Sequence, residues 1–294
     1  MKVLSTITAI LLVTVLPGRS EADASVESNV IYGMYSGLAL LMDVHYPEDP
    51  NGYGLVEIGG SGFHALLSLD TPPLSDQRGP NEAVLVERGY TVFSINHRAA
   101  PRFRYPAAVE DVRRAVRYIR HHADRFQIDP NRIGALGGSS GGHLALMAGL
   151  MDGDPGGGDS VDGESSKVQA VVAMNPPTDF VSFAINQEGA IDFVSSFLGV
   201  VVWPGLLPDS IEASVYAEAS PINYVSPDDP PVLLIHGDAD DVVPYNQSEL
   251  LRPALSEQGV TVELISIPGG GHGGWITPEL YERFADWFDL HLRE

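Results

Sequence analysis

Residues Ile133-Gly-Ala-Leu-Gly-Gly-Ser139-Ser140-Gly-Gly-His143 place two serines among glycines, directly after an apolar run. The apolar run is typical of a short buried strand, and the residues that follow predict a helix over His143–Leu150. Glycines permit a sharp turn between such a strand and helix, and this turn exposes a serine Oγ at the end of the strand. The stretch therefore predicts a reactive serine in an α/β architecture. The spacing fits Ser139 and Ser140 equally, because both have glycines two residues away on each side.

Two later segments supply a candidate acid and a candidate base, each after a predicted strand. His236-Gly-Asp-Ala-Asp240-Asp-Val-Val-Pro244 follows Val232–Ile235, and Pro268-Gly-Gly-Gly-His272 follows Val262–Ile267. The carboxyl ends of parallel strands meet at one edge of a sheet, so we expect Asp240 and His272 beside the serine. Asp238 and Asp241 compete with Asp240 as the acid.

The chain order Ser, Asp, His belongs to the α/β-hydrolase arrangement and differs from the orders of the two large serine protease folds. A serine hydroxyl is a weak nucleophile at neutral pH, so His272 would take its proton and pass it to the leaving alkoxide. Asp240 would fix the histidine tautomer and stabilise the imidazolium. N–H donors for the tetrahedral intermediate are expected from the residue after the nucleophile and from the loop Gly59-Gly60-Ser61-Gly62.

The rest of the chain alternates strand-like and helix-like runs. Asn29–Tyr35 and Leu38–Tyr46 flank Ser36-Gly37 and predict an opening antiparallel hairpin. Further strands are predicted at Leu55–Ile58, Thr91–Asn96, Ile133–Leu136, Ala170–Met174, Val232–Ile235 and Val262–Ile267, and further helices at Ala107–His122, at Gln247–Gln258 and from Pro278. This alternation predicts an α/β fold with a mainly parallel sheet, an N-terminal hairpin and helices on both faces, over residues 25–294.

The segments outside this alternation give weaker signals. Residues 152–166 are rich in glycine and acids and predict an exposed loop, whose carboxylate spacing does not fit an EF-hand. We therefore expect no metal and no organic cofactor. The apolar segment 180–227 could form a cap over a substrate pocket or pack against the main sheet. The eight arginines between Arg98 and Arg125 fit an exposed helix face, and His97 and His143 fit structural roles.

Residues 1–24 have the pattern of a secretory signal peptide. Lys2 precedes the largely apolar run Val3–Leu16, and Ala22-Asp-Ala24 resembles a cleavage site. The run is short for a membrane span, and without cysteine no lipid anchor can attach through one, so we expect a secreted or periplasmic protein without a stable membrane anchor. The net charge of −22 disfavours nucleic acid as a partner.

Several segments resemble carboxylesterases of the α/β-hydrolase superfamily, in the branch of hormone-sensitive-lipase-like and bacterial feruloyl or acetyl-xylan esterase-like enzymes. They are Ile95-Asn-His-Arg-Ala-Ala-Pro101, Tyr105-Pro-Ala-Ala-Val-Glu-Asp-Val112, Ile128-Asp-Pro-Asn-Arg-Ile133, GGSSGGHLA and HGDADDVVP. In the family pattern the nucleophile stands two residues before the Gly-Gly-His step. The resemblance therefore implies Ser139 as nucleophile and Asp240 as acid. It also implies Gly60, Ser61 and Ser140 as N–H donors, although the family's histidine is replaced by Gly59.

The resemblance implies a serine carboxylesterase acting on a small-molecule or polysaccharide-linked ester, with short acyl groups such as acetyl. Two alternatives remain open at this point. One is a serine peptidase of prolyl-oligopeptidase type, which shares the fold and the triad order, although no propeller domain precedes the catalytic part. The other is a non-catalytic binding protein on a hydrolase scaffold, which only the altered oxyanion loop favours. The sequence does not fix the oligomeric state.

Overall fold

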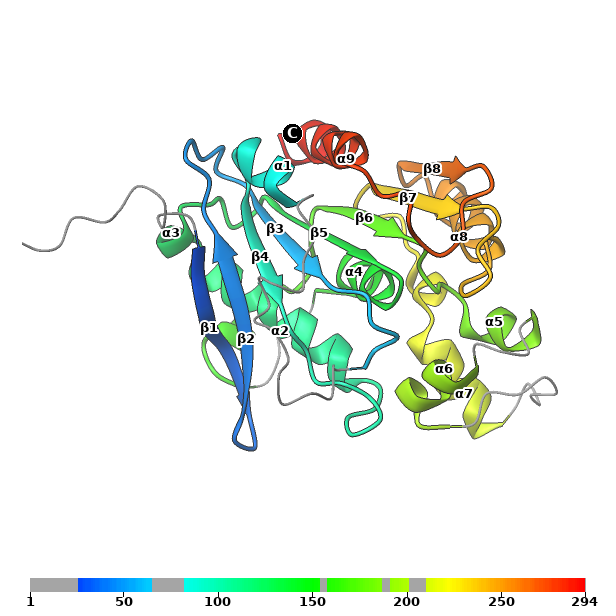
Figure 1. Cartoon of the computed structure of the whole chain (residues 1–294). Helices are drawn as coiled ribbons and strands as arrows, with labels where there is room; N and C mark the ends of the chain where they lie inside the picture. The colour runs from blue at the N-terminus through cyan, green and yellow to red at the C-terminus, as the bar shows by residue number, and fades with distance from the viewer. Residues whose placement is uncertain (1–25, 65–81, 154–157, 187–190, 201–209, 294) are drawn as a thin grey trace, which may run out of the picture.

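The computed structural model describes residues 26–64, 82–153, 158–186, 191–200 and 210–293 (Figure 1). Its centre is an eight-stranded sheet with the order β1-β2-β4-β3-β5-β6-β7-β8. The strands are β1 (Val26–Tyr35), β2 (Leu38–His45), β3 (Gly54–Ile58), β4 (Thr91–Ile95), β5 (Ile133–Gly138), β6 (Ala170–Met174), β7 (Val232–Gly237) and β8 (Val262–Ile267). The signal peptide predicted over residues 1–24 lies outside the described residues.

The strand pairing matches the predicted fold class. β1 and β2 form the antiparallel hairpin, and β2 also pairs antiparallel with β4. All other neighbouring strands run parallel. The hairpin turns at Ser36-Gly37, where Gly37 has a φ of 84° that suits a residue without a side chain.

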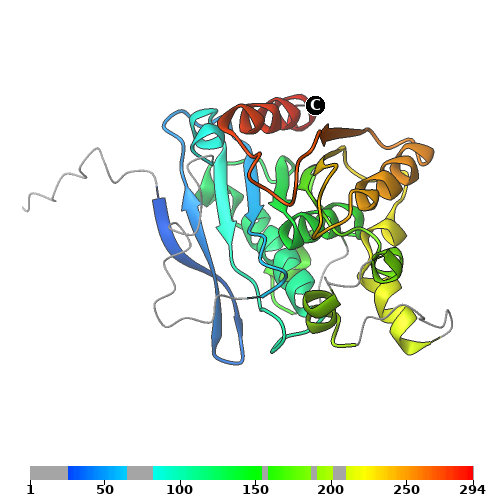
Figure 2. The same cartoon turned by 45° about the vertical axis from the view of Figure 1, so that its right-hand side comes forward.

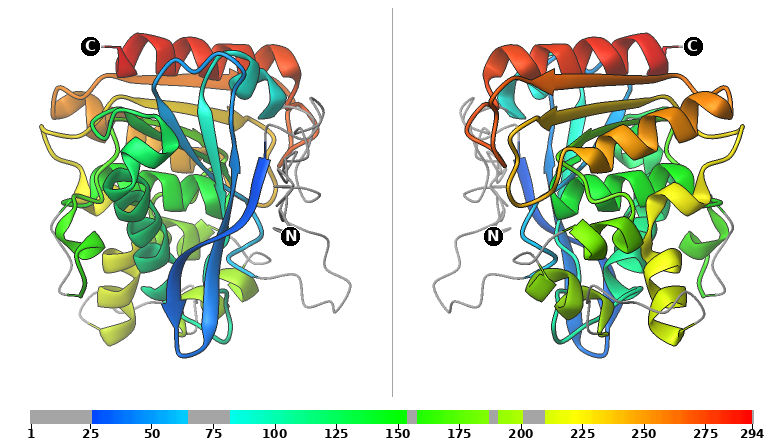
Figure 3. Two further views of the ribbon diagram at one scale, coloured as in Figure 1. Left: turned by 90° about the vertical axis from the view of Figure 1, so that its left-hand side faces the viewer. Right: turned by 90° about the vertical axis from the view of Figure 1, so that its right-hand side faces the viewer.

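Helices cover both faces of the sheet, as predicted (Figures 1 and 3). The helices α2 (Ala107–His121), α4 (Ser140–Leu150) and α8 (Asn246–Glu257) share one buried core with residues such as Val56 and Leu234. The helices α1 (Glu82–Glu87) and α9 (Pro278–Leu292) share a second core with Leu55 and Leu233. Neighbouring strand residues thus enter opposite cores, because successive side chains in a strand point to opposite faces.

The helices differ from the prediction chiefly at the start of α4 and in two short helices. Helix α4 begins at Ser140, three residues before the predicted start at His143. Glycines at its start permit close packing, since a Cβ at Gly141 would lie 2.1 Å from the carbonyl oxygen of Ile58. The short helices α1 and α3 (Ala123–Phe126) were not predicted, because too few residues carry their periodicity.

The arginines after β4 do not form the predicted exposed face. The apolar stripe of α2 is buried as expected, but Arg98, Arg117 and Arg120 are buried too. Arg120 donates to the carbonyl oxygens of Pro130, Ser165 and Lys167, so its charge is compensated by peptide dipoles.

The described parts of the acidic segment, residues 152–153 and 158–166, contact α2 through ion pairs and hydrogen bonds, whereas the sequence predicted an exposed loop. Arg114 pairs with Asp159 and Asp162 at 2.8 Å, and Arg113 donates to the carbonyl oxygen of Asp152. The segment includes a 3₁₀ turn, η2 (Val161–Gly163), whose Val161 is buried. Opposite charges that lie far apart in the sequence explain this arrangement, and local composition does not reveal it.

The described part of the 180–227 segment forms α5 (Phe180–Asn186), α6 (Ile191–Leu198), α7 (Ile211–Ala219) and the 3₁₀ turn η3 (Pro221–Tyr224). The three helices lie together at the lower right of Figure 1. Phe180 and Phe197 belong to the main core, where Phe197 stacks on Phe63 with ring centroids 3.7 Å apart. Phe180 and Phe197 thus pack in the core, in line with one of the two alternatives for this segment, and the cap role stays a prediction. Across the described ranges, no helix has both the length and the apolar character needed to cross a membrane.

Candidate active site

Ser139 occupies the turn between β5 and α4. Its backbone has φ 55° and ψ −124°, a conformation that a residue with a side chain seldom adopts. The turn is held by the Ser139 N–H, which donates to the carbonyl oxygen of Met174 in β6 at 2.7 Å. It is also tightly packed, since a Cβ at Gly137 would lie 2.4 Å from the carbonyl carbon of Gly141. Gly137 and Gly141 thus permit this tight turn, and Ser139, not Ser140, occupies its apex.

The structure brings His272 and Asp240 to Ser139 from two loops at the same edge of the sheet. The His272 Nε2 atom lies 3.0 Å from Ser139 Oγ, and His272 Nδ1 lies 2.8 Å from Asp240 Oδ2. Figure 2 shows the chain after β8 descending toward the centre of the molecule before it enters α9. Asp238, the competing acid, instead accepts the N–H of Gly269 at 2.6 Å, and Asp241 is exposed.

Asp240 is held as a carboxylate. Burial alone would raise its pKa, but hydrogen bonds with His236 and His272 and the N–H groups of Val242 and Val243 hold the pKa well below its usual range. Both N–H groups donate to Asp240 Oδ1 at 2.9 Å, which leaves Oδ2 facing His272. The acid therefore stays ionised and correctly oriented at neutral pH.

His236 is a site residue whose role the sequence did not reveal. Its ring is fully buried, and Nε2 lies 2.9 Å from the carbonyl oxygen of Val243 and 3.4 Å from Asp240 Oδ2. A carbonyl oxygen only accepts, so Nε2 carries the proton, while Nδ1 accepts from the Ser248 hydroxyl at 2.8 Å. His236 thus contacts Asp240 Oδ2, the carboxylate oxygen that His272 also contacts. The only signal was a histidine four residues before an aspartate.

Two of the three N–H donors expected for an oxyanion, those of Gly60 and Ser140, have no acceptor among the described residues. A Cβ at Gly60 would lie 2.4 Å from the carbonyl oxygen of Gly138 and 3.2 Å from Ser139 Cβ, so only glycine allows this approach. Ser140 is the first residue of α4 and has no acceptor for its N–H inside the helix. The third donor differs from the expectation: the N–H of Ser61 donates to Ser140 Oγ at 2.9 Å.

A cavity of about 480 Å³ opens in front of Ser139. Met174, Phe193, Val242 and Ile276 give it apolar walls. Its other lining residues are Gly60, Ser61, Gly62, His64, Gly138, Ser139, Asn175 and His272. Apart from the two imidazoles, none of these side chains can carry a charge. The cavity therefore fits an uncharged group next to the serine.

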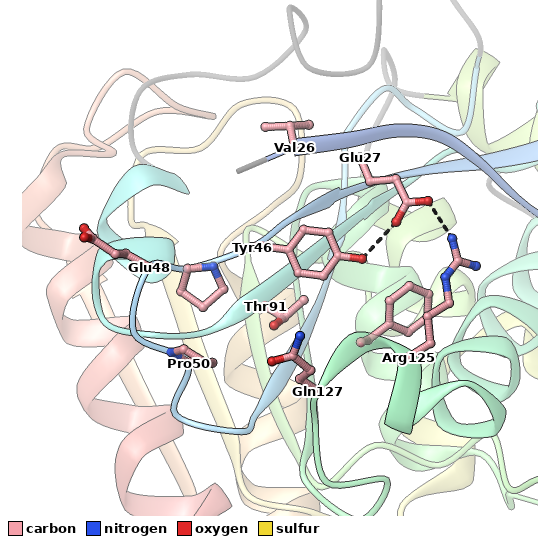
Figure 4. A pocket seen from close by; sticks show the side chains of 10 residues that line it. Val26, Glu27, Tyr46, Glu48, Pro50, Thr91, Arg125 and Gln127 are labelled. Atoms are coloured by element: carbon pink, nitrogen blue, oxygen red, sulfur yellow. Dashed lines mark hydrogen bonds and ion pairs between the residues drawn. The ribbon is translucent and has the colours of Figure 1, made fainter. Parts of the chain in front are cut away.

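A second cavity, of about 530 Å³, lies at the opposite end of the parallel strands, where Thr91 begins β4 (Figure 4). Glu27 lines this cavity, where it pairs with Arg125 and accepts a hydrogen bond from the Tyr46 hydroxyl at 2.9 Å. Its lining residues include no serine, cysteine or histidine, so it holds no pair like Ser139 and His272. Over the described ranges no cluster of three His, Asp or Glu side chains could hold a metal ion.

This fold, with a serine turn, a histidine loop and an aspartate loop at one edge of the sheet, defines an α/β-hydrolase. The family model BD-FAE matches residues 42–255, and the chain belongs to this family.

Relatives agree with this assignment. The chain is 30% identical to the esterase LipQ of Mycobacterium tuberculosis over 260 residues, which cover 87% of this chain and 59% of LipQ. Overall it spans about half the length of the curated relatives that it matches.

Two solved structures are similar over most of the chain. A truncated carbohydrate esterase from gut microbiota has a TM-score of 0.78 and 29% identity, covering 92% of this chain and 97% of its own. An acetyl ester-xyloside bifunctional hydrolase from Caldicellulosiruptor lactoaceticus has a TM-score of 0.70 and 26% identity, with coverages of 85% and 88%.

Proposed function

We propose that this protein is an exported serine carboxylesterase that cleaves short-chain acyl esters through an acyl-enzyme. The observation that carries the proposal is the chain of hydrogen bonds from Ser139 Oγ through His272 to Asp240, at 3.0 and 2.8 Å. A serine at the apex of a constrained turn, with a base and an ionised acid in line, is the arrangement that activates a hydroxyl for attack on a carbonyl.

The proposed reaction has two halves. Ser139 Oγ attacks the ester carbonyl carbon while its proton passes to His272 Nε2, and the negative charge moves to the carbonyl oxygen. The N–H groups of Gly60 and Ser140 stabilise this oxygen. Collapse of the intermediate breaks the bond to the alcohol, which leaves with the proton from His272. Water, deprotonated by the same His272, then attacks the acyl-enzyme and releases the carboxylic acid.

Acetyl or similarly short esters, including those carried on a polysaccharide, are the proposed substrates. Support comes from two similar structures, described as a carbohydrate esterase and an acetyl ester-xyloside hydrolase. Support also comes from the cavity, whose rim includes the exposed backbone of Gly60 and Ser61. An exposed rim leaves room for a bulky alcohol while the acyl group enters the apolar part. The signal peptide predicted over residues 1–24 would deliver the enzyme to such a substrate outside the cytoplasm.

The test is a substrate series with the mature protein. We expect kcat/KM for p-nitrophenyl esters to be highest at acetate or propionate and to fall as the acyl chain lengthens to octanoate. Release of acetate from acetylated xylan would extend the proposal to a polysaccharide. Cleavage of an aminoacyl naphthylamide without cleavage of the esters would instead indicate a peptidase. Binding of the esters without turnover would indicate a binding protein.

A further inference from the structure

The side chain of Ser140 joins the nucleophile turn to the loop after β3. Its Oγ accepts the N–H of Ser61 at 2.9 Å, across 79 residues of sequence. Ser140 is 1% exposed, whereas Ser61 lies at the surface. A buried hydroxyl therefore accepts a hydrogen bond from an exposed loop.

This bond adds to the other contacts that hold the loop after β3. On the far side, Phe63 is buried and its carbonyl oxygen accepts the N–H of Ala100 at 2.8 Å. On the near side, a Cβ at Gly59 would have no neighbour within 4 Å, but the Gly59 carbonyl carbon lies close to α4, 2.9 Å from the position of a Cβ on Gly141. Between these two positions, the Ser140 hydroxyl ties Ser61 to the nucleophile turn.

The consequence concerns Gly60, the neighbour of Ser61. Gly60 packs closely on Gly138 and Ser139. The position of its N–H relative to the nucleophile therefore depends on the loop staying in place. We propose that the Ser140 side chain is a positioning group: its Oγ holds the Ser61 N–H and so keeps the Gly60 N–H aimed at the developing oxyanion. This inference rests on the proposed serine esterase function.

The proposal also fixes the number of oxyanion donors. With its N–H on Ser140 Oγ, Ser61 does not reach the oxyanion, so Gly60 and Ser140 are the two donors. The alternative, a blocking arrangement, is that Ser140 Oγ only occupies the Ser61 N–H in the resting enzyme and releases it to the oxyanion during catalysis. The two arrangements predict opposite effects when the hydroxyl is removed.

Ser140→Ala is the decisive variant, because it removes Oγ and keeps the N–H. We expect kcat to fall by about three- to tenfold, the size of one neutral hydrogen bond, with KM little changed. Affinity for a trifluoromethyl ketone, which forms a tetrahedral adduct with a serine, should fall by the same factor. Ser220→Ala is the matched control: Ser220 is also fully buried and accepts a backbone N–H, that of Phe180, at 2.8 Å, outside the site.

The outcomes separate the hypotheses. A lower melting temperature in both variants, with kcat and ketone affinity reduced only in Ser140→Ala, would support the positioning role. Unchanged kcat in Ser140→Ala would reduce the bond to a structural contact, and an increased kcat would favour the blocking arrangement; either overturns the proposal. Failure of the proposed function is a different result, since the wild-type protein would then show no turnover that Ser139→Ala abolishes.

Discussion

The Nε2 atom of His272 lies 3.0 Å from the Oγ of Ser139, although 133 residues separate them in the sequence. The two residues meet because β5 and β8 run parallel in one sheet, so the loops after their carboxyl ends lie at the same edge. Asp240 reaches His272 from the loop after β7, the strand next to β8. The relative position of the three side chains is therefore a property of the sheet.

Asp240→Asn should lower kcat by about 10⁴, because an amide cannot hold His272 in the required tautomer or stabilise its charged form. Asp238→Asn is the control, since an asparagine oxygen can still accept the Gly269 N–H that Asp238 accepts now. Steady-state kinetics with p-nitrophenyl acetate would measure both. Equal losses in the two variants would mean that Asp240 is not the acid.

Gly60→Ala should lower kcat by about 10²–10³, the cost of one lost oxyanion donor, because the new methyl group would push the loop away from Ser139. Gly59→Ala adds the same methyl group at a position with no neighbour within 4 Å, so its activity should stay near that of the wild type. The pair of kcat values, at matched folded fractions, is the measurement. Full activity of Gly60→Ala would remove this residue from the proposed mechanism.

His143 makes the stability of the fold depend on pH. Its ring is fully buried and donates from Nδ1 to the carbonyl oxygen of Pro177, while Nε2 has no partner among the described residues. Burial lowers its pKa to about 4, below the usual value of 6.5. This contribution to stability is complete above about pH 6.5 and is lost as the pH falls toward 4, because the unfolded chain takes up the proton first.

Urea unfolding at several pH values measures the contribution of His143 to stability. Between pH 7 and pH 5 the wild type should lose about 2 kcal/mol more stability than His143→Leu, which has no group to protonate. Comparing the pH dependence of the two proteins cancels the contributions of all other groups. Parallel stability curves would show that His143 is not held neutral by the fold.

Arg120→Met should destabilise the protein by about 3 kcal/mol, because it removes a charged donor from partly buried hydrogen bonds to the carbonyl oxygens of Pro130 and Lys167. Arg125→Met removes a more exposed arginine, paired with Glu27 at the surface, and should cost less than about 1 kcal/mol. The free energies of unfolding of the two variants give the comparison. Similar values would mean that the buried guanidinium stabilises no more than a surface ion pair does.

Much of this structure could be predicted because its signals are local. β6 and β8 have the predicted bounds, since an apolar run between turn residues marks a buried strand directly. The positions of Ser139, Asp240 and His272 followed from strand ends, and the choice of Ser139 over Ser140 needed the family pattern. The strand ends and the family pattern can both be recognised in short stretches of sequence.

The parts that could not be predicted depend on contacts between distant segments. The burial of Arg120 requires carbonyl groups that lie 45 and 47 residues away, and the bond from Ser61 to Ser140 spans 79 residues. A sequence pattern describes neighbours in the chain, so it gave arginines an exposed face and gave Ser61 a free N–H. Only the folded arrangement shows which donors are already occupied.

The central claim is that Ser139 forms an acyl-enzyme, and the most direct test is pre-steady-state release of p-nitrophenol from p-nitrophenyl acetate. The wild-type protein should give a burst of about one equivalent per active site. Ser139→Ala should give no burst and a kcat lower by about 10⁶, as removal of a triad nucleophile does elsewhere. Ser140→Ala should retain the burst. A burst that persists in Ser139→Ala, or is lost in Ser140→Ala alone, would contradict the assignment of the nucleophile.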